Sequence, residues 1–387
     1  MNDRERFNAQ MHYQPVDRCP MWDFGFWSET LDLWYEQGLP ADVGTDEFFG
    51  MDAQWRGVPI DLRHGLMPAF EEQVIEDRGE TELVRQNDGV LVHRRKWMQT
   101  IPHYVDWLLK DRDSWRKHYL PRLDPDTPGR IPDEFAACCR RAGDDRRDYP
   151  IGISAGSMYG VLRNWMGLEN ISLLVYDDPA LFEEMTRTLG DLYFSVLSRA
   201  LPIARDAGLT FDYATMWEDM CYNSGPLLSP AMVKRYMFGH YRRITSLLHD
   251  YGVEVVILDC DGRIDELIEI WLEAGVNCMF PIEVGTWRAD PPAYRRQYGR
   301  RLLMMGGFDK RILAGDQAAI AGEVRRLLPL VEQGGFIPFC DHRVPADVSL
   351  ANYVYYLKQA RAVWGKGLGL KPLGQPAGFD SGCGPGV

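Results

Sequence analysis

The sequence predicts an α/β protein built as a (β/α)8 TIM-type barrel. After residue 145, short apolar runs typical of strands alternate with longer segments of helical apolar spacing. The predicted strands lie at 149–154, 209–213, 253–258, 277–281, 302–306 and 336–339. Repeated strand–helix units of this kind indicate a parallel sheet. A strand at 18–25 and one more within 100–145 would bring the number to eight and close a barrel.

The predicted helices carry start signals. Asn2, with Glu5 three residues later, forms a capping box for a first helix. Asp178 and Ser229 each precede a proline, which places a capping residue directly before a proline at the first helical position. The helix that begins at Ser229 is expected to end near Gly252, a residue type that commonly ends helices.

The barrel is predicted to occupy residues 1–364, with a β-rich insertion at 50–99. There, short β-like pieces alternate with turn signals such as Asn87-Asp88-Gly89, which favour a β-hairpin insertion. Residues 365–387 contain eight glycines and three prolines and are predicted to be a disordered tail.

Composition limits the classes of function. The 387 residues include 43 Lys and Arg against 56 Asp and Glu, a net charge of −13. This balance argues against nucleic acid, because binding phosphates needs a basic face. No apolar run approaches the roughly 20 residues that span a bilayer. The N-terminus is charged and lacks a signal core, so the sequence predicts a cytoplasmic protein that acts on a small molecule or binds a protein partner.

Reactive side chains follow the predicted strands. The run 336–339 stops at Cys340, Asp341, His342 and Arg343. Because the carboxyl ends of barrel strands converge on one mouth, these side chains are expected to meet those that follow the other strands. Among the latter, the predicted catalytic residues are Glu218, Tyr159 and Asp23.

Crowded carboxylates either bind a cation or share protons. The metal hypothesis takes Asp259, Asp261 and His342 as ligands from separate strand ends. The reserve ligands are Glu283, Cys260 and Cys340, together with Glu218. The alternative is that individual carboxylates cap helices or pair with Arg163, Arg263 or Arg343. For Asp261, directly before Gly262 and a helix, capping is a serious alternative.

Aromatic residues are dense around the predicted first strand. Trp22, Phe24, Phe26 and Trp27, with Arg343 from the last strand end, are predicted to bind a planar or apolar substrate. Ordinary core packing is the alternative for the aromatic residues.

Several motifs together resemble the uroporphyrinogen decarboxylase superfamily over most of residues 1–364. They are Arg18-Cys19-Pro20, Glu218-Asp219 before Ser229-Pro230, Gly306-Gly307-Phe308-Asp309-Lys310, and Asp341-His342-Arg343-Val344-Pro345. The superfamily includes the decarboxylase and several corrinoid-dependent methyltransferases. The resemblance implies a (β/α)8 barrel and a possible homodimer.

The chain looks closer to the methyltransferase branch. The decarboxylase pattern places two arginines in the loop after the first strand, whereas residues 23–29 contain none. The zinc-binding His-x-Cys and distant Cys of thiol-activating methyltransferases fall on Asp259, Asp261 and His342. Two carboxylates and an imidazole are harder ligands than thiolates. A site of this kind is expected to hold Zn²⁺ and to activate an oxygen leaving group rather than a thiol.

The resemblance therefore implies transfer of a methyl group from a methoxylated, aromatic small molecule to a corrinoid, with Glu218 or Tyr159 as proton donor. The cobalamin-binding pattern Asp-x-His-x-x-Gly is absent, so the corrinoid is expected on a separate partner protein. Two alternatives stay open: a metal-free lyase related to the decarboxylase that acts on a carboxylated substrate, and a non-catalytic ligand-binding barrel.

Overall fold

The computed structural model describes residues 1–96 and 101–374. The chain forms two compact units. The terminal unit comprises Met1–Gln54, Ile282–Gln297 and Met304–Val387, and the central unit comprises Trp55–Pro281 and Tyr298–Leu303.

A parallel sheet forms the centre of the central unit. Its strands, in the order β10-β9-β6-β5, are β5 (Gly152–Gly156), β6 (Tyr213–Trp217), β9 (Val255–Asp259) and β10 (Cys278–Ile282). In the register of β6 and β9, Tyr213 faces Val255 and Trp217 faces Asp259, so the two strands end level with each other. The loops that follow them therefore begin side by side.

Strand β6 corrects one predicted range, because it begins at Tyr213 rather than at 209. The residues before it make polar contacts instead of sheet pairs. The Asp212 carboxylate accepts a hydrogen bond from the Ile151 amide at 2.8 Å and pairs with Arg147 at 3.0 Å.

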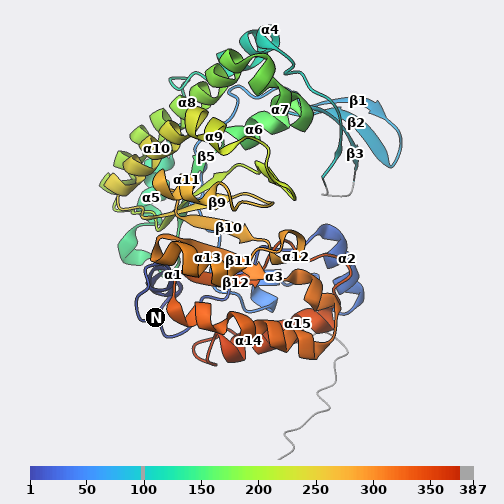
Figure 1. Cartoon of the computed structure of the whole chain (residues 1–387), viewed down its shortest axis with the longest axis vertical. Helices are drawn as coiled ribbons and strands as arrows, with labels where there is room; N and C mark the ends of the chain where they lie inside the picture. The colour runs from blue at the N-terminus through green and yellow to red at the C-terminus, as the bar shows by residue number, and fades with distance from the viewer. Residues whose placement is uncertain (97–100, 375–387) are drawn as a thin grey trace, which may run out of the picture. The chain divides into compact units, whose positions relative to one another are not determined.

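The helices of the central unit follow the strands in the order expected of strand–helix repeats. They are α4 (Arg112–Ser114), α5 (Phe135–Arg141), α6 (Tyr159–Met166), α7 (Leu168–Asp177), α8 (Pro179–Asp206), α9 (Pro230–Tyr236), α10 (Phe238–Asp250) and α11 (Ile268–Glu273). The long helix α8 lies alongside α10 (Figure 1). The capping residues Asp178 and Ser229 are confirmed. The single helix predicted from Ser229 to Gly252 is two helices, because the helical conformation is interrupted at Met237.

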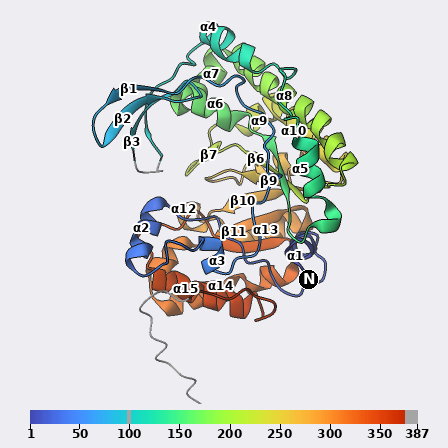
Figure 2. The same cartoon turned by 180° about the vertical axis from the view of Figure 1, so that it is seen from behind.

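A four-stranded antiparallel sheet, called the arm here, also belongs to the central unit. Its strands are β1 (Gln73–Asp77), β2 (Thr81–Arg85), β3 (Leu91–Arg95) and β4 (His103–Asp106). The arm lies next to α6 and α7 (Figures 1 and 2). The strand predicted within 100–145 as part of the barrel is thus β4 of the arm, which is a correction. A short hairpin, β7 (Cys221–Tyr222) with β8 (Gly225–Pro226), follows β6.

The outer edge of β5 is covered by an irregular segment. Gly57 makes a single parallel bridge with Gly152, whose amide donates to the Arg56 carbonyl at 2.8 Å. The fully buried Arg130 holds this segment in place, since its guanidinium donates at 2.6–3.0 Å to four main-chain carbonyls. These belong to Arg63, Gly65, Arg122 and Asp124.

The terminal unit contains the parallel pair β11 (Leu303–Phe308) and β12 (Phe336–Cys340), in register from Met304 opposite Phe336. Its helices are α1 (Asp3–Met11), α2 (Ser28–Glu36), α3 (Thr45–Phe48), α12 (Val284–Trp287), α13 (Pro291–Tyr298), α14 (Gln317–Gln333) and α15 (Leu350–Val363). The capping box of Asn2 and Glu5 is confirmed at α1. Helices α14 and α15 lie side by side (Figures 1 and 2).

Residues 18–25 do not form the strand that was predicted for them. One parallel bridge, Phe26 with Val344, stands at this position instead. Side chains accept hydrogen bonds from two of the main-chain amides here. The Met21 amide donates to Asp52 at 2.9 Å, and the Asp23 amide donates to Gln54 at 2.6 Å. Six parallel strands with intervening helices nevertheless give the chain the α/β, TIM-type class that the sequence predicts.

The Gly- and Pro-rich tail is described as far as residue 374. Lys371 Nζ donates to the Met51 carbonyl at 2.9 Å and the Gly374 amide to the Phe48 carbonyl at 2.6 Å. The rest of the tail predicted to be disordered, 375–387, lies outside the described residues. Within the described ranges no helix is long and apolar enough to cross a lipid bilayer.

Candidate functional site

Three carboxylates meet where β6 and β9 end. Each of Asp219, Asp259 and Asp261 offers one oxygen, and these oxygens lie within 4.8 Å of one another. We call this group the acid cluster. The level ends of β6 and β9 explain it, because Asp219 and Asp261 stand two residues beyond the facing pair Trp217 and Asp259. The structure thus brings Asp259 and Asp261 together, as predicted, and adds Asp219.

Asp219 is held from two sides. Arg163 of α6 donates through Nη1 to the Asp219 carbonyl at 2.9 Å and through Nη2 to its carboxylate at 3.0 Å. The Asp261 amide donates to the other carboxylate oxygen at 3.1 Å. The φ angle of Asp219 is +41°, a left-handed conformation that is uncommon outside glycine and often found at functional sites. Burial, and next the charge of Asp261, raise the pKa of the Asp219 carboxyl.

The loop after Asp261 requires glycine. Gly262 has a φ of +98°, and a Cβ there would lie 2.7 Å from the carbonyl carbon and 2.8 Å from the carbonyl oxygen of Cys221. Gly262 therefore allows the loop after β9 to pass against the β7 strand.

Glu218, a predicted catalytic residue, is fully buried beside the cluster. Its carboxylate accepts hydrogen bonds from the amides of Met158 at 3.0 Å, Tyr159 at 2.7 Å and Gly160 at 3.1 Å, and from the Tyr241 hydroxyl at 2.8 Å. Burial raises the pKa of Glu218 to about 7, although these hydrogen bonds oppose the rise. A carboxylate at the start of α6 satisfies amides that have no partner within the helix. This contact gives Glu218 a clear structural role, and its proposed role in catalysis stays a prediction.

A cavity of about 730 Å³, called the aromatic cavity here, adjoins the acid cluster. It is lined by Ile101, Tyr104, Trp107, Arg163, Asn164, Gly167, Leu168, Glu169, Ser172, Trp217 and Asp219. Tyr104 and Trp107 of the arm stack with ring centroids 6.2 Å apart, and Arg163 lies 5.4 Å over the Trp217 ring. The cavity therefore has aromatic walls and a carboxylate of the acid cluster at one place in its lining.

The predicted catalytic residue Tyr159 lies behind the cavity wall. Its ring is fully buried, and its hydroxyl lies 3.4 Å from the hydroxyl of Ser172, which lines the aromatic cavity. Burial raises the pKa of Tyr159, so the phenol is protonated at neutral pH. The reserve ligand Cys260 is a buried thiol with a pKa well above its usual value, caused first by burial.

In the terminal unit, His342 lies among predicted substrate-binding residues. Its ring meets Phe24 edge-on with centroids 5.1 Å apart and stacks on Trp27 at 5.8 Å. The Arg343 guanidinium lies 5.8 Å over Phe24 and 5.4 Å over Trp27. These four residues form one aromatic and cationic group, in which the three rings are half-buried and Arg343 is exposed.

The other two aromatic residues of the predicted substrate set pack against neighbouring aromatic rings. Trp22 is 3% exposed and stacks on Phe7 at 5.1 Å. Phe26 packs against Trp34 at 5.0 Å and Tyr353 at 5.3 Å. Ordinary core packing accounts for the burial of Trp22, whereas Phe26 is half-buried, and a substrate-binding role for either stays a prediction.

The remaining predicted residues of the terminal unit are also enclosed. The Asp23 carboxylate accepts a hydrogen bond from the Tyr353 hydroxyl, and burial raises its pKa to about 6. Glu283 accepts a hydrogen bond from the indole of Trp287. Cys340 is fully buried, and its burial raises the pKa of the thiol.

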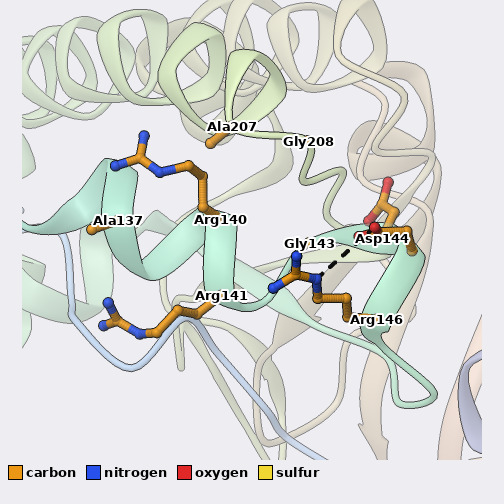
Figure 3. A pocket seen from close by; sticks show the side chains of 9 residues that line it. Ala137, Arg140, Arg141, Gly143, Asp144, Arg146, Ala207 and Gly208 are labelled. Carbon is orange, nitrogen blue, oxygen red and sulfur yellow. Dashed lines mark ion pairs between the residues drawn. The ribbon is translucent and has the colours of Figure 1, made fainter.

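A second large cavity, of about 720 Å³, has a basic lining that includes Arg140, Arg141 and Arg146 (Figure 3). Arg140 and Arg141 belong to the last turn of α5, where cations stabilise the helix dipole. Arg146 pairs with Asp145 at 4.0 Å. The lining also includes Asp144 and Asp145, which partly offset its positive charge, and the aromatic cavity is the better candidate site.

Sequence reasoning missed three kinds of contributor. The sequence does not single out Asp219 as a ligand, although it directly follows Glu218. Pairing between carboxylates and arginines is expected, and Arg163 pairs with Asp219, but the sequence gives no sign that Arg163 also lines the site. Tyr104 and Trp107 carried no signal, because nothing in the sequence places the arm beside the strand ends.

Solved structures that resemble this chain include a methyltransferase and a methionine synthase. A methyltransferase from Methanosarcina mazei is 14% identical with a TM-score of 0.52, and the match covers 95% of this chain and 99% of that one. A vitamin-B12 independent methionine synthase from Listeria monocytogenes is 13% identical with a TM-score of 0.33, covering 60% and 68%, an overlap too weak to support a conclusion. The first match shows a shared fold. A search of curated proteins finds no match.

The family relationship comes from the sequence. Residues 120–363 match the family described as Uroporphyrinogen decarboxylase (URO-D), a stretch that spans more than half of the chain and includes the acid cluster. The chain therefore belongs to the uroporphyrinogen decarboxylase family.

Proposed function

We propose that this protein is a methyltransferase that removes the methyl group from a methoxylated aromatic molecule and passes it to a corrinoid carried by a partner protein. The observation that carries the proposal is the aromatic cavity with Asp219 of the acid cluster in its lining. Aromatic walls suit a planar apolar ring. The likeness to a methyltransferase in fold, together with the family membership, supports the general class of reaction.

The acid cluster has the donors that a divalent cation needs. Its three ligand atoms are carboxylate oxygens, a hard set that suits Mg²⁺ or Mn²⁺ and that Zn²⁺ also accepts. Asp219, Asp259 and Asp261 would hold the ion, and His342 as a further ligand for Zn²⁺ stays a prediction. A bound cation would supply electrostatic stabilisation of the negative charge that develops on the departing oxygen.

The chain's own residues bind the substrate and move the proton. Trp107, Trp217 and Tyr104 would hold the ring of the methyl ether. During transfer the bond between methyl carbon and oxygen breaks, the oxygen keeps the electron pair and gains a proton, and the methyl group goes to the acceptor. Of the predicted proton donors, Tyr159 is better supported than Glu218. Its hydroxyl is near that of Ser172 in the cavity lining, whereas the Glu218 carboxylate already accepts four hydrogen bonds.

The cavity's charge disfavours the lyase alternative. Among the described residues that line the cavity, Arg163 is the one cation, and it is already paired with Asp219. A substrate with several carboxylates would need cationic partners that this lining does not offer.

The test combines metal content with turnover. Purified protein would be analysed by mass spectrometry for Mg, Mn and Zn, alongside Asp259→Ala, Asp261→Ala and His342→Ala. The exposed residue Asp42 provides a control, Asp42→Ala. The same proteins would be mixed with 2-methoxyphenol and cob(I)alamin, with methylcobalamin followed by absorbance and catechol by chromatography.

The proposal expects near-stoichiometric metal in the wild type and in Asp42→Ala, with loss in Asp259→Ala and Asp261→Ala. Retention of metal in His342→Ala would exclude His342 as a ligand and would leave the three aspartates of the acid cluster as the metal site. Wild-type protein without metal, even after incubation with each cation, would contradict the mechanism. Turnover of a carboxylated substrate without cobalamin would favour the lyase, and tight binding without any turnover would favour the non-catalytic barrel.

A further inference from the structure

A third cavity lies at the opposite ends of the strands that carry the acid cluster. It has a volume of about 330 Å³, at the lower end of the range for small-molecule sites. We call it the amino-end cavity, because Gly152, Ile153 and Ser154 at the start of β5 line it, as does Phe211 before β6. Its other lining residues are Gly57, Val58, Ile60, Asp61, Leu62, His64, Gly65 and Phe135.

His64 is the unusual residue in this lining. It is 8% exposed, and its Nε2 is buried without a hydrogen-bond partner among the described residues. The ring packs edge-on against Tyr193, with centroids 5.5 Å apart. A buried polar atom without a partner is costly, so a native structure that keeps one calls for an explanation.

The position of His64 is fixed by its neighbours. Its amide donates to the Leu62 carbonyl at 3.2 Å. The buried Arg130 donates to the carbonyls on either side, to Arg63 at 2.8 Å and to Gly65 at 3.0 Å. The pKa of His64 is lowered to about 4, first by burial and then by the charge of Arg130. His64 is therefore a neutral imidazole at physiological pH, held rigidly in the cavity wall.

The remaining lining defines the ligand chemistry. Val58, Phe135, Ile153 and Phe211 are buried and apolar, whereas Asp61 and Ser154 are exposed and polar. The lining contains no lysine or arginine. A metal ion is a poor occupant, because the described residues gather three metal-ligating side chains at the acid cluster and not here.

We propose that the amino-end cavity is a second binding site that takes a small primary amine with an apolar body. The apolar part would fill the space between Phe135 and Phe211, and the ammonium would donate to His64 Nε2. The carboxylate of Asp61 would pair with the ammonium and offset the charge of Arg130, which on its own disfavours a cation at this ring. The site does not depend on the methyltransferase activity proposed above.

Benzylamine is the probe, with benzyl alcohol as its uncharged counterpart. Binding would be measured by calorimetry at pH 7.5, and the histidine nitrogens would be followed by NMR on ¹⁵N-labelled protein. The variants are His64→Phe, which keeps a ring against Tyr193 but removes the nitrogen, and Asp61→Asn, which removes the exposed charge.

The proposal expects benzylamine to bind the wild type and to shift the His64 Nε2 signal. His64→Phe is expected to lose most of this binding while its unfolding temperature stays the same or rises, because the unpartnered nitrogen is gone. Asp61→Asn should weaken benzylamine several-fold and leave benzyl alcohol unchanged, since an exposed ion pair contributes only modestly, about 1 kcal/mol or less.

Two outcomes would overturn the proposal. One is the absence of benzylamine binding to the wild type at millimolar concentration, or equal binding to His64→Phe. The other is a lower unfolding temperature of His64→Phe without any effect on binding, which would mean that an enclosed water serves the nitrogen and that His64 is structural.

Discussion

Arg163 binds Asp219 twice, once through the carboxylate at 3.0 Å and once through the main-chain carbonyl at 2.9 Å. The second contact matters as much as the first, because it holds the peptide of a residue with a φ of +41°. The same guanidinium lies over Trp217. One arginine thus sets the geometry of the acid cluster and shapes the wall of the aromatic cavity.

The first prediction separates the charge of Asp219 from its backbone conformation. Asp219→Asn should fold normally, since asparagine tolerates the left-handed region, but should bind a divalent cation roughly tenfold or more weakly. Asp219→Val should lose about 1–3 kcal/mol of stability as well, because a β-branched residue is strained there. Urea unfolding and a cation titration distinguish the two losses. Equal stability of both variants would argue against strain at this position.

The second prediction concerns Gly262 and has a matched control at Gly208. Both have positive φ, +98° and +78°, but a Cβ at Gly208 would meet no atom within 4 Å. Gly208→Ala should therefore cost about 1 kcal/mol, from the backbone alone. Gly262→Ala should cost more and should also weaken cation binding, because the Cβ would push against the Cys221 carbonyl. Unfolding free energies that fall equally in the two variants would rule out the steric part of the argument.

The third prediction is a pH dependence due to Glu218. Its pKa is raised from the ordinary value of 4.5 to about 7 in the folded state, so the folded state binds the proton more tightly than the unfolded state. The contribution of Glu218 to the free energy of unfolding is therefore fully present at low pH and is lost as the pH rises from about 4.5 through 7. At about 1.4 kcal/mol per pKa unit, the loss is at most about 3 kcal/mol.

Glu218→Gln removes this titration. The variant should be less stable than the wild type at every pH, since the NH2 group of glutamine accepts no hydrogen bond, whereas both oxygens of the carboxyl group keep acceptor capacity in either protonation state. The difference between the two should be larger at pH 5 than at pH 8. Urea unfolding at several pH values measures it, and a difference that stays constant with pH would contradict the assignment to Glu218.

The fourth prediction tests the aromatic cavity through neighbouring residues of β4. Tyr104 lines the cavity and is 38% exposed, whereas Val105 is 45% exposed and does not line it. Tyr104→Ala should raise the KM for a methoxylated aromatic substrate by up to about tenfold, in line with the ~0.5–1.5 kcal/mol of an aromatic pair. Val105→Ala should leave KM unchanged, and unfolding temperatures should confirm that both variants are folded. An equal effect of both substitutions would mean that the arm acts through its stability.

Local signals in the sequence were read correctly wherever the interaction itself is local. The caps at Asn2, Asp178 and Ser229 each involve residues three positions apart, and all are present. Six parallel strands are present as well, although β6 begins at Tyr213 rather than at 209, because the bounds of a strand depend on pairing with its neighbours. The predicted strand at 18–25 failed because its main chain is partly served by the side chains of Asp52 and Gln54, which no periodicity reveals.

The candidate site was harder to predict because it depends on register and on distant segments. Asp259 and Asp261 could be predicted as strand-end ligands, but the addition of Asp219 requires that β6 and β9 end level with each other. Glu218 looked catalytic in the sequence because it follows a strand, yet it accepts hydrogen bonds from three consecutive amides of another loop. His64 and Arg130 gave no signal, since their importance lies in burial and in contacts with main-chain carbonyls.

The four hydrogen bonds from Arg130 to main-chain carbonyls, called the clamp here, also affect self-association of the protein. The segment that the clamp pins covers the outer edge of β5 with a single bridge at Gly57, where a further strand would otherwise be free to pair. Exposed sheet edges are templates for aggregation. Loss of the hydrogen bonds from Arg130 is therefore expected to cause self-association and lower solubility in concentrated solution. These effects should appear before any change in the function of the acid cluster at the other end of the strands.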